Sequence, residues 1–187
     1  MKRHSLFCIL FFIVTLSGCV SIEPKYAPTA PPQKEFSYVA GKFTRTHSGG
    51  FAFILRNADS GIEYPMSLGE DTALPSDGFD QVVAIKVPPG KYVVSDWVTY
   101  GTLTKERSKK HPIKDSILNV PFTIEAGSVM FLGNYSANTS VTRGYPAGTI
   151  NYSITPSVAI YRDSRDAFLK AYPLFNGSAF KCLSCSL

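Results

Sequence analysis

From residue 36 onward the sequence predicts an all-β domain, an antiparallel β-sandwich or open barrel with one short C-terminal helix. Runs rich in aromatic and β-branched residues alternate with Gly, Pro, Asn and Asp over most of this stretch. The runs are short and closely spaced, which is typical of sandwiches. A helical period appears only near the C-terminus. With no internal repeat, we expect a single domain over 36–187.

The apolar runs place the expected strands in order along the chain. We expect strands over 36–45, 51–57, 79–87, 92–100, 117–124 and 129–136, and a further strand pair across 149–161. Turns fall between them, for example at Pro88-Pro89-Gly90. Pro89 fixes a turn's φ, and Gly90 supplies the positive φ that a type II turn needs.

The segment DSRDAFLKAYP predicts a helix near 164–172. Asp163 is placed to cap it, and Asp166 matches the acidic third position of a capping box. Phe168 and Tyr172 fall on one face, and Pro173 ends the helix. We expect this helix to pack over one end of the sandwich, with docking onto a partner as the alternative.

The first nineteen residues have the layout of a secretory signal. Lys2 and Arg3 precede an apolar stretch over 6–15, which is too short to span a bilayer. The following LSGC, 16–19, resembles the lipobox of bacterial lipoproteins. The resemblance implies that residues 1–18 are a signal peptide and that Cys19 is diacylated, becomes the first residue and is then N-acylated. The alternative is an ordinary secretory signal with Cys19 unmodified.

A lipid anchor would attach the protein to a membrane and would also determine its compartment. Each buried methylene contributes about 0.8 kcal/mol, so two or more acyl chains hold a protein stably on a membrane. No aspartate follows Cys19, which in Gram-negative lipoproteins implies the outer membrane, facing either the periplasm or the surface. Residues 19–35 hold four prolines, which favour polyproline II, so we expect a tether. The alternative is that part of this segment packs along the domain edge through Tyr26.

Composition excludes little but argues against nucleic acid. Loss of residues 1–18 from the 187 leaves 169, with 17 basic against 14 acidic residues, a net charge of +3.

Cys182 and Cys185 are the remaining cysteines beside Cys19, and in an oxidising compartment we expect a disulfide. Two reduced thiols on a frayed tail are the alternative. We expect no metal site and no cofactor beyond the covalent lipid.

Two stretches carry a further resemblance. VPPGKYVV, 87–94, is similar to the strand-turn-strand of transthyretin-like and carboxypeptidase-regulatory-like sandwiches, and to the envelope lipoproteins grouped as DUF2846. FTIEAG, 122–127, followed by an aromatic-rich strand, extends the likeness. The resemblance spans roughly 50–136 and implies an immunoglobulin-like or prealbumin-like sandwich. It implies no catalytic residue.

No catalytic set stands out. His47 and His111 lie in polar, turn-like contexts, so we expect both on solvent-exposed loops, and no GxSxG motif is present. Acidic residues gather in the stretch 62–80, which we expect to be a loop. They are Glu63, Glu70, Asp71, Asp77 and Asp80. A wall-glycan or peptide hydrolase using paired carboxylates is therefore the enzymatic alternative.

The insertion TKERSKKHPIKD, 104–115, is the best candidate for a surface site. Its basic residues outnumber its two acids, so it is suited to anionic phosphates of lipid or wall polymer. They are Lys105, Arg107, Lys109, Lys110 and Lys114. A solvated hairpin loop without a ligand is the alternative. The tract 138–148 is a second candidate, as a rim loop for a ligand or partner.

These observations lead to one functional hypothesis and two alternatives. We expect a membrane-anchored envelope lipoprotein, not an enzyme, that acts as a binding or assembly module with an envelope protein as partner. The sequence does not indicate a small-molecule ligand. The alternatives are the wall hydrolase and a purely structural surface lipoprotein.

Overall fold

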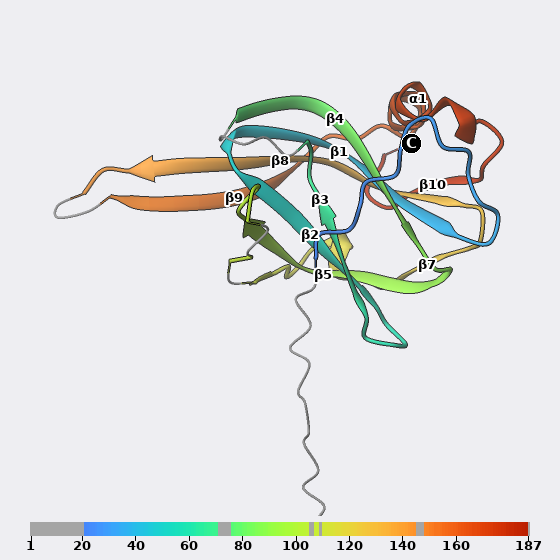
Figure 1. The fold of residues 1–187 in the computed structure, drawn as a ribbon, viewed down its shortest axis with the longest axis horizontal. Coiled ribbons are helices and arrows are strands. Elements are labelled where there is room, and N and C mark those ends of the chain that lie inside the picture. The colour runs from blue at the N-terminus through green and yellow to red at the C-terminus, as the bar shows by residue number, and fades with distance from the viewer. Residues whose placement is uncertain (1–20, 71–75, 105–106, 109, 145–147, 187) are drawn as a thin grey trace, which may run out of the picture.

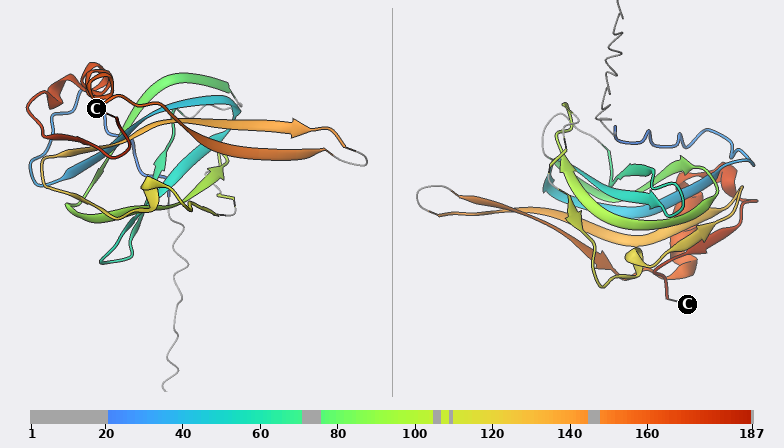
Figure 2. Two further views of the ribbon diagram at one scale, coloured as in Figure 1. Left: turned by 180° about the vertical axis from the view of Figure 1, so that it is seen from behind. Right: turned by 90° about the horizontal axis from the view of Figure 1, so that it is seen from below.

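The computed structural model describes residues 21–70, 76–104, 107–108, 110–144 and 148–186. Two β-sheets face each other as two layers (Figures 1 and 2). The strands are β1 (Ser37–Ser48), β2 (Gly50–Asn57), β3 (Glu63–Ser67), β4 (Ser76–Val87), β5 (Gly90–Tyr100), β6 (His111–Pro112), β7 (Phe122–Ile124), β8 (Val129–Thr142), β9 (Thr149–Ser157) and β10 (Phe180–Cys182). The helices are the 3-10 turns η1 (Ile117–Asn119) and η2 (Pro173–Phe175) and the α-helix α1 (Tyr161–Ala171). The predicted sandwich with a short C-terminal helix is confirmed.

Sheet A and sheet B differ in strand direction. Sheet B runs β3-β2-β5-β6, with β7 also on β5, and all its pairs are antiparallel. Sheet A runs β10-β8-β1-β4, with β9 beside β8. Both β1 and β10 pair with β8 in parallel. The sequence pattern predicted only antiparallel pairing, because it locates strands without showing which distant strands become neighbours.

The main core lies between the sheets and is strongly aromatic. Alternate residues of β2 point into it, so Phe51, Phe53 and Leu55 are all buried. Each such side chain contributes roughly 1.5–3 kcal/mol through removal from water. A second cluster covers the outer face of sheet A, where Phe168 and Tyr172 of α1 and its C-terminal end pack on β1, β4 and β8. The helix therefore covers one end of sheet A, as expected (Figure 2).

Three element predictions need correction. Residues 117–124 were expected to form one strand, but Ser116 caps the 3-10 turn η1 by accepting from the Leu118 N–H (3.3 Å), and only β7 remains as strand. The stretch 62–80 was expected to be a loop, but it contains β3. Pro65 is tolerated there because β3 is an edge strand of its sheet. A strand pair across 149–161 was expected, but β9 pairs instead with the extended end of β8.

Helix α1 also begins differently from the prediction. Ile160, not Asp163, is the N-cap, and it makes no side-chain cap. The C-terminal segment replaces the cap, because the Tyr161 N–H donates to the Ser186 carbonyl (2.9 Å). Asp163 lies in the first turn, where its charge is favourable to the helix dipole.

Candidate functional site at the open side of the sandwich

One lateral side of the sandwich, between β3 and β4, is closed by the Pro-rich segment. The Glu23 N–H donates to Pro65 of β3 (2.8 Å), and the Tyr26 N–H donates to Ala84 of β4 (2.7 Å). The Tyr26 ring lies edge-on to Tyr38, with centroids 4.9 Å apart. Residues 19–35 were expected to be a tether, with packing along the domain edge as the alternative. The stretch from Ile22 to Tyr26 packs along the edge.

The opposite side, between β9 and the β5–β6 edge, is hollowed by two cavities of about 370 and 410 Å³. Phe53 and Ile154 line the first, whereas Phe51 and Tyr152 line the second. The two pairs come from the same two strands, β2 and β9, and are two residues apart on each strand. Same-face neighbours on a strand are roughly 7 Å apart, so the cavities follow one another along the strands. We call this pair of cavities the trough.

Trp97 lines the 370 Å³ cavity. Strand β5 lies between β2 and β6, so the indole has Phe51 on one side and His111 on the other. The His111 ring stacks at 4.1 Å and 12°, and the Phe51 ring lies at 5.9 Å and 26°. His111 therefore covers one indole face, and Phe51 lies beside the ring at a larger, offset separation.

Polar groups converge at the rim of the 370 Å³ cavity. Lys114, Asp115 and Ser116 line it beside apolar Ile113 and Leu118. Asp115 has φ 52°, a left-handed conformation that a non-glycine residue adopts at a cost of order 1 kcal/mol. Such strain concentrates at ligand clamps and turns. The rim is therefore held in a defined shape around an apolar interior.

The aromatic floor of this cavity is neutral. Tyr135 lies edge-on to Phe53, with centroids 5.2 Å apart. Burial raises the pKa of the Tyr135 hydroxyl, so the group stays protonated and donates to the Leu132 carbonyl at 3.3 Å. The floor therefore offers apolar contact without charge.

The predicted basic insertion does not form one basic patch among its described residues. It returns along β5, with the Ser108 N–H donating to Thr99 and the Ile113 N–H donating to Ser95. Lys110 bonds Glu63 at 2.5 Å, Arg107 is half-buried against the 410 Å³ cavity, and Lys114 is exposed at the other cavity. Lys105 and Lys109 lie outside the described residues. The insertion is an edge of sheet B, not a free hairpin loop.

His111 was expected on an exposed loop, and this expectation is wrong. Within β6 it pairs with Trp97 of β5 and is half-buried by the ring stack. His47 lies in β1. Neither placement follows from local polarity, because both segments are polar and the pairing partners lie elsewhere in the sequence.

Three acidic residues of 62–80 in the described part of the chain each bond a lysine. Glu63 bonds Lys110, Glu70 bonds Lys25 at 2.6 Å, and Asp80 bonds Lys42 at 3.3 Å. Their lysine partners come from three separate parts of the chain. Asp77 has an interaction partner of its own, and Asp71 lies outside the described residues. Over the described ranges, no group of three His, Cys, Asp or Glu side chains is arranged to hold a metal ion.

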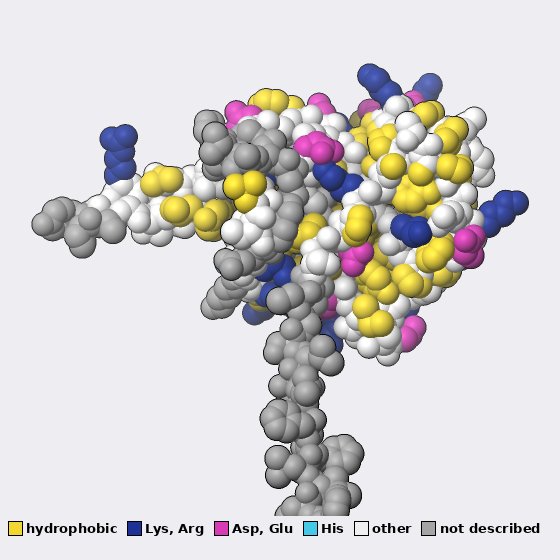
Figure 3. All heavy atoms as spheres, viewed as in Figure 1, with side chains coloured by type: hydrophobic (Ala, Val, Ile, Leu, Met, Phe, Trp, Pro, Cys, Tyr) yellow, Lys and Arg dark blue, Asp and Glu magenta, His cyan; other side chains and the backbone are white. Residues whose placement is uncertain are grey.

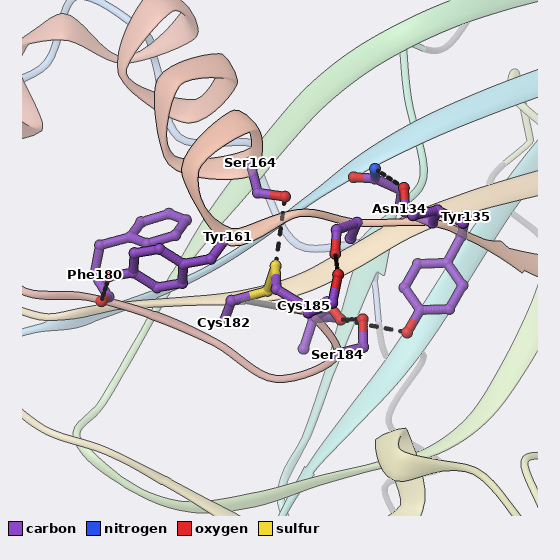
Figure 4. Close-up of a disulfide and its surroundings, with 12 residues drawn as sticks. Asn134, Tyr135, Tyr161, Ser164, Phe180, Cys182, Ser184 and Cys185 are labelled. Carbon is purple, nitrogen blue, oxygen red and sulfur yellow. Dashed lines mark hydrogen bonds between the residues drawn. A yellow bond between two sulfur atoms is a disulfide. The ribbon is translucent and has the colours of Figure 1, made fainter.

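A disulfide joins Cys182 and Cys185 within the C-terminal segment, beside α1 and β8 (Figure 4). Ser164 of α1 lies 3.4 Å from Cys185 Sγ, and since a disulfide sulfur only accepts, the hydroxyl donates. Ser184 donates to the Leu132 carbonyl at 2.7 Å. This approach requires Gly133, because a Cβ there would lie 1.9 Å from Ser184 Oγ.

Sequence reasoning missed the trough itself. Its wall, Trp97 with His111, depends on the pairing of β5 with β6, which no local pattern indicates. A usable signal was present in 135–142 and 149–157, where apolar residues alternate with Ser, Thr and Asn except at Thr139. The tract 138–148, expected to be a rim loop, is instead largely the end of the β8–β9 hairpin, with 145–147 outside the described residues.

Comparison with known proteins gives no family. No family model and no curated protein matches the chain. Among solved structures, a leucine-rich repeat protein from Bacteroides thetaiotaomicron VPI-5482 is similar over 65% of this chain, at 10% identity and a TM-score of 0.36. The similar region spans 21% of that protein. A similarity this low supports no inference about function.

The described residues include no helix long and apolar enough to cross a bilayer. Cys19, the predicted lipidation site, precedes the first described residue.

Proposed function

We propose that this protein is an envelope lipoprotein, anchored through Cys19, whose sandwich binds a partner through the trough and performs no catalysis. The observation that carries the proposal is the asymmetry of the sandwich. One lateral side is closed by the segment that leads to Cys19, and the other is open, aromatic-lined and edged with Lys114, Asp115 and Ser116. Apolar cavities with a few convergent polar groups are the usual form of binding sites.

In this proposal the lipid anchor leaves the trough accessible. At the start of the described chain, Ile22 packs on the outer face of sheet B, against Ala52, Ile54 and Val98. A lipid at Cys19 would hold this face toward the membrane and leave the trough, which opens between the two sheets, accessible to another envelope component. The apolar floor and the stack of His111 on Trp97 favour apolar side chains as the bound group.

The anchor is tested by metabolic labelling with an alkyne fatty acid. We expect the wild-type chain to incorporate label and to fractionate with membranes, and the Cys19→Ser variant to do neither. A Ser17→Thr variant, which keeps the cysteine, is the matched control. Equal labelling of wild type and Cys19→Ser would contradict lipidation at this residue.

The site is tested by photo-cross-linking in cells from benzoylphenylalanine at Pro112, an exposed residue at the trough. Arg165, exposed on the outer face of α1, is the control position. We expect a discrete adduct from Pro112 that is lost when Ile113→Asp is added, and none from Arg165. Equal adducts from both positions, or none from either, would contradict binding at the trough.

A further inference from the structure

The β8–β9 hairpin extends past the rest of the molecule (Figure 1). Strand β1 accompanies β8 only as far as Asn138, yet β8 continues to Thr142, paired with β9 from Thr149. Sheet B stops near the start of this extension, at Gly50 of β2 and Tyr100 of β5, which pair with each other. We call residues 139–142 and 149–152 the arm. It is a two-stranded extension of sheet A without a second layer.

The two faces of the arm differ in chemistry. One face continues the core-facing side of sheet A and carries Val141, Ile150 and Tyr152, which are 65%, 54% and 41% exposed, with Thr139 opposite Tyr152 as its polar residue. At the base of the arm the Tyr152 ring lies edge-on to Phe51 of sheet B. The other face carries only hydroxyl and amide side chains. They are Ser140, Thr142, Thr149 and Asn151. This alternation is that of a half-buried sheet, so the apolar face is patterned for burial but lies uncovered (Figure 3).

The charge and the free edge of the arm indicate what kind of group could cover its apolar face. Neither β8 nor β9 contains a charged residue, and the charge nearest to the arm along β8 is the exposed Arg143, which follows Thr142. Among the described residues no strand pairs with the outer edge of β9. An apolar face beside a free edge fits an extended polypeptide, which supplies alternate apolar side chains and backbone hydrogen bonds.

A cation with one unsatisfied nitrogen lies at the base of the arm. Arg107 forms a bridge to Tyr100 and lines the 410 Å³ cavity with Tyr152. Its Nη1 is buried and has no acceptor in the described part of the chain. A buried guanidinium nitrogen without an acceptor is unfavourable, and a carboxylate is the group whose geometry matches it.

We propose that the arm and this cavity bind an extended segment of another protein, lying on the apolar face and placing a carboxylate against Arg107. The inference deepens the function proposed above and depends on it. The bound segment supplies over the arm the layer that sheet B lacks there. Its apolar side chains contact Val141, Ile150 and Tyr152.

The arm's dimensions favour such a segment over a second copy of this chain. Four residues per strand give an apolar face roughly 13 Å long and two strands wide. Two such faces packed together fall well short of the roughly 800 Å² per partner that stable complexes bury. A single strand that continues from the arm into the cavity uses both surfaces at once.

The test uses the full-length protein in detergent and a displayed library of random twelve-residue peptides. Enriched peptides are synthesised as free acids, and their Kd values are measured by fluorescence polarisation. We expect alternating apolar residues and one carboxylate. Arg107→Gln should raise Kd about 30-fold, because it removes one partner of a buried charge pair. Val141→Asn should raise it about tenfold.

Ser140→Asn is the matched control, since Ser140 neighbours Val141 on the opposite face of the same strand. It should leave Kd unchanged. Amidation of the peptide carboxylate should weaken binding to wild type but add nothing in Arg107→Gln, which isolates the pair. All variants are checked by circular dichroism for native folding.

Three outcomes would overturn the inference. They are the enrichment of no peptide, equal binding to wild type and Arg107→Gln, and a concentration-dependent dimer that Val141→Asn abolishes, which would assign the arm to a second copy. Adducts from Pro112 together with unchanged Kd in both Arg107→Gln and Val141→Asn would refute the inference but leave the proposed function standing. The absence of Pro112 adducts would contradict the proposed function and, with it, the inference that depends on it.

Discussion

Arg45 is the largest fully buried side chain, at 1% exposure, and it joins three segments at one end of the sandwich. It extends from β1 and donates to the carbonyls of Gly49, at 3.0 Å, and Glu70. Gly69 makes room for it, since a Cβ there would lie 2.8 Å from the Arg45 Nε. The guanidinium therefore satisfies backbone carbonyls that the adjoining turns leave without partners.

We expect Arg45→Ala to lower the free energy of unfolding by about 2–4 kcal/mol, because it leaves buried carbonyls unsatisfied and opens a cavity. Arg56→Ala, at an exposed residue of β2, should change it by less than about 0.5 kcal/mol. Urea unfolding of both variants measures the difference. Equal effects would show that the Arg45 contacts contribute nothing beyond those of a surface arginine.

Tyr38 couples stability to alkaline pH. Burial raises the pKa of Tyr38 to about 12, and its hydroxyl accepts from the Gln33 N–H at 2.6 Å. The Tyr26 and Glu35 groups nearby raise the pKa further. The unfolded chain loses this proton near pH 10, so the stabilisation is complete below pH 10 and is lost as pH rises toward 12.

We therefore expect the wild type to lose stability between pH 10 and 12 more steeply than Tyr38→Phe, which has no proton to lose there. Burial also raises the pKa values of Tyr92, Tyr135 and Tyr172, so the variant keeps a weaker pH dependence. Thermal unfolding at several pH values measures both slopes. Parallel slopes would contradict a buried, hydrogen-bonded Tyr38.

Among the elements, the strands with strong local patterns were predictable and those defined by distant pairing were not. Residues 92–100 are rich in aromatic and β-branched residues and fall within β5. By contrast, β3 and β6 are short and contain proline, and β10 is only three residues long, so each is a strand only because a neighbour pairs with it. The trough, bounded by β6 and β9, was for this reason beyond local prediction.

The C-terminal segment contains a disulfide, which we expect to stabilise its folded conformation. The loop closed by Cys182 and Cys185 is very short, so the chain-entropy model gives about 2 kcal/mol of stabilisation. We expect the Cys182→Ser, Cys185→Ser double variant to lose about that much in urea unfolding. It should also exchange the Tyr161 amide faster, because Ser186, its acceptor, is released. Reduction of the wild type should reproduce both effects, whereas unchanged exchange would contradict a clamping role.

At the scale of the whole molecule, we expect the arm to contribute to binding but little to stability. Val141 and Ile150 are mostly exposed, and an isolated two-stranded hairpin is marginally stable in water. The core instead lies between the sheets and under α1, at a distance from the arm's end (Figure 1). Shortening the arm should therefore cost the folded domain little.

We expect a chain in which Asn-Gly replaces residues 140–151 to keep its Tm within a few degrees, because this dipeptide closes a two-residue hairpin and no core contact is removed. The same change should strongly weaken binding of the selected peptides, since the contacts with Val141 and Ile150 are gone while Tyr152 and Arg107 remain. Calorimetry and fluorescence polarisation on one preparation test both statements. A large fall in Tm would mean that the arm stabilises the fold, and the apolar face would then need no partner to explain it.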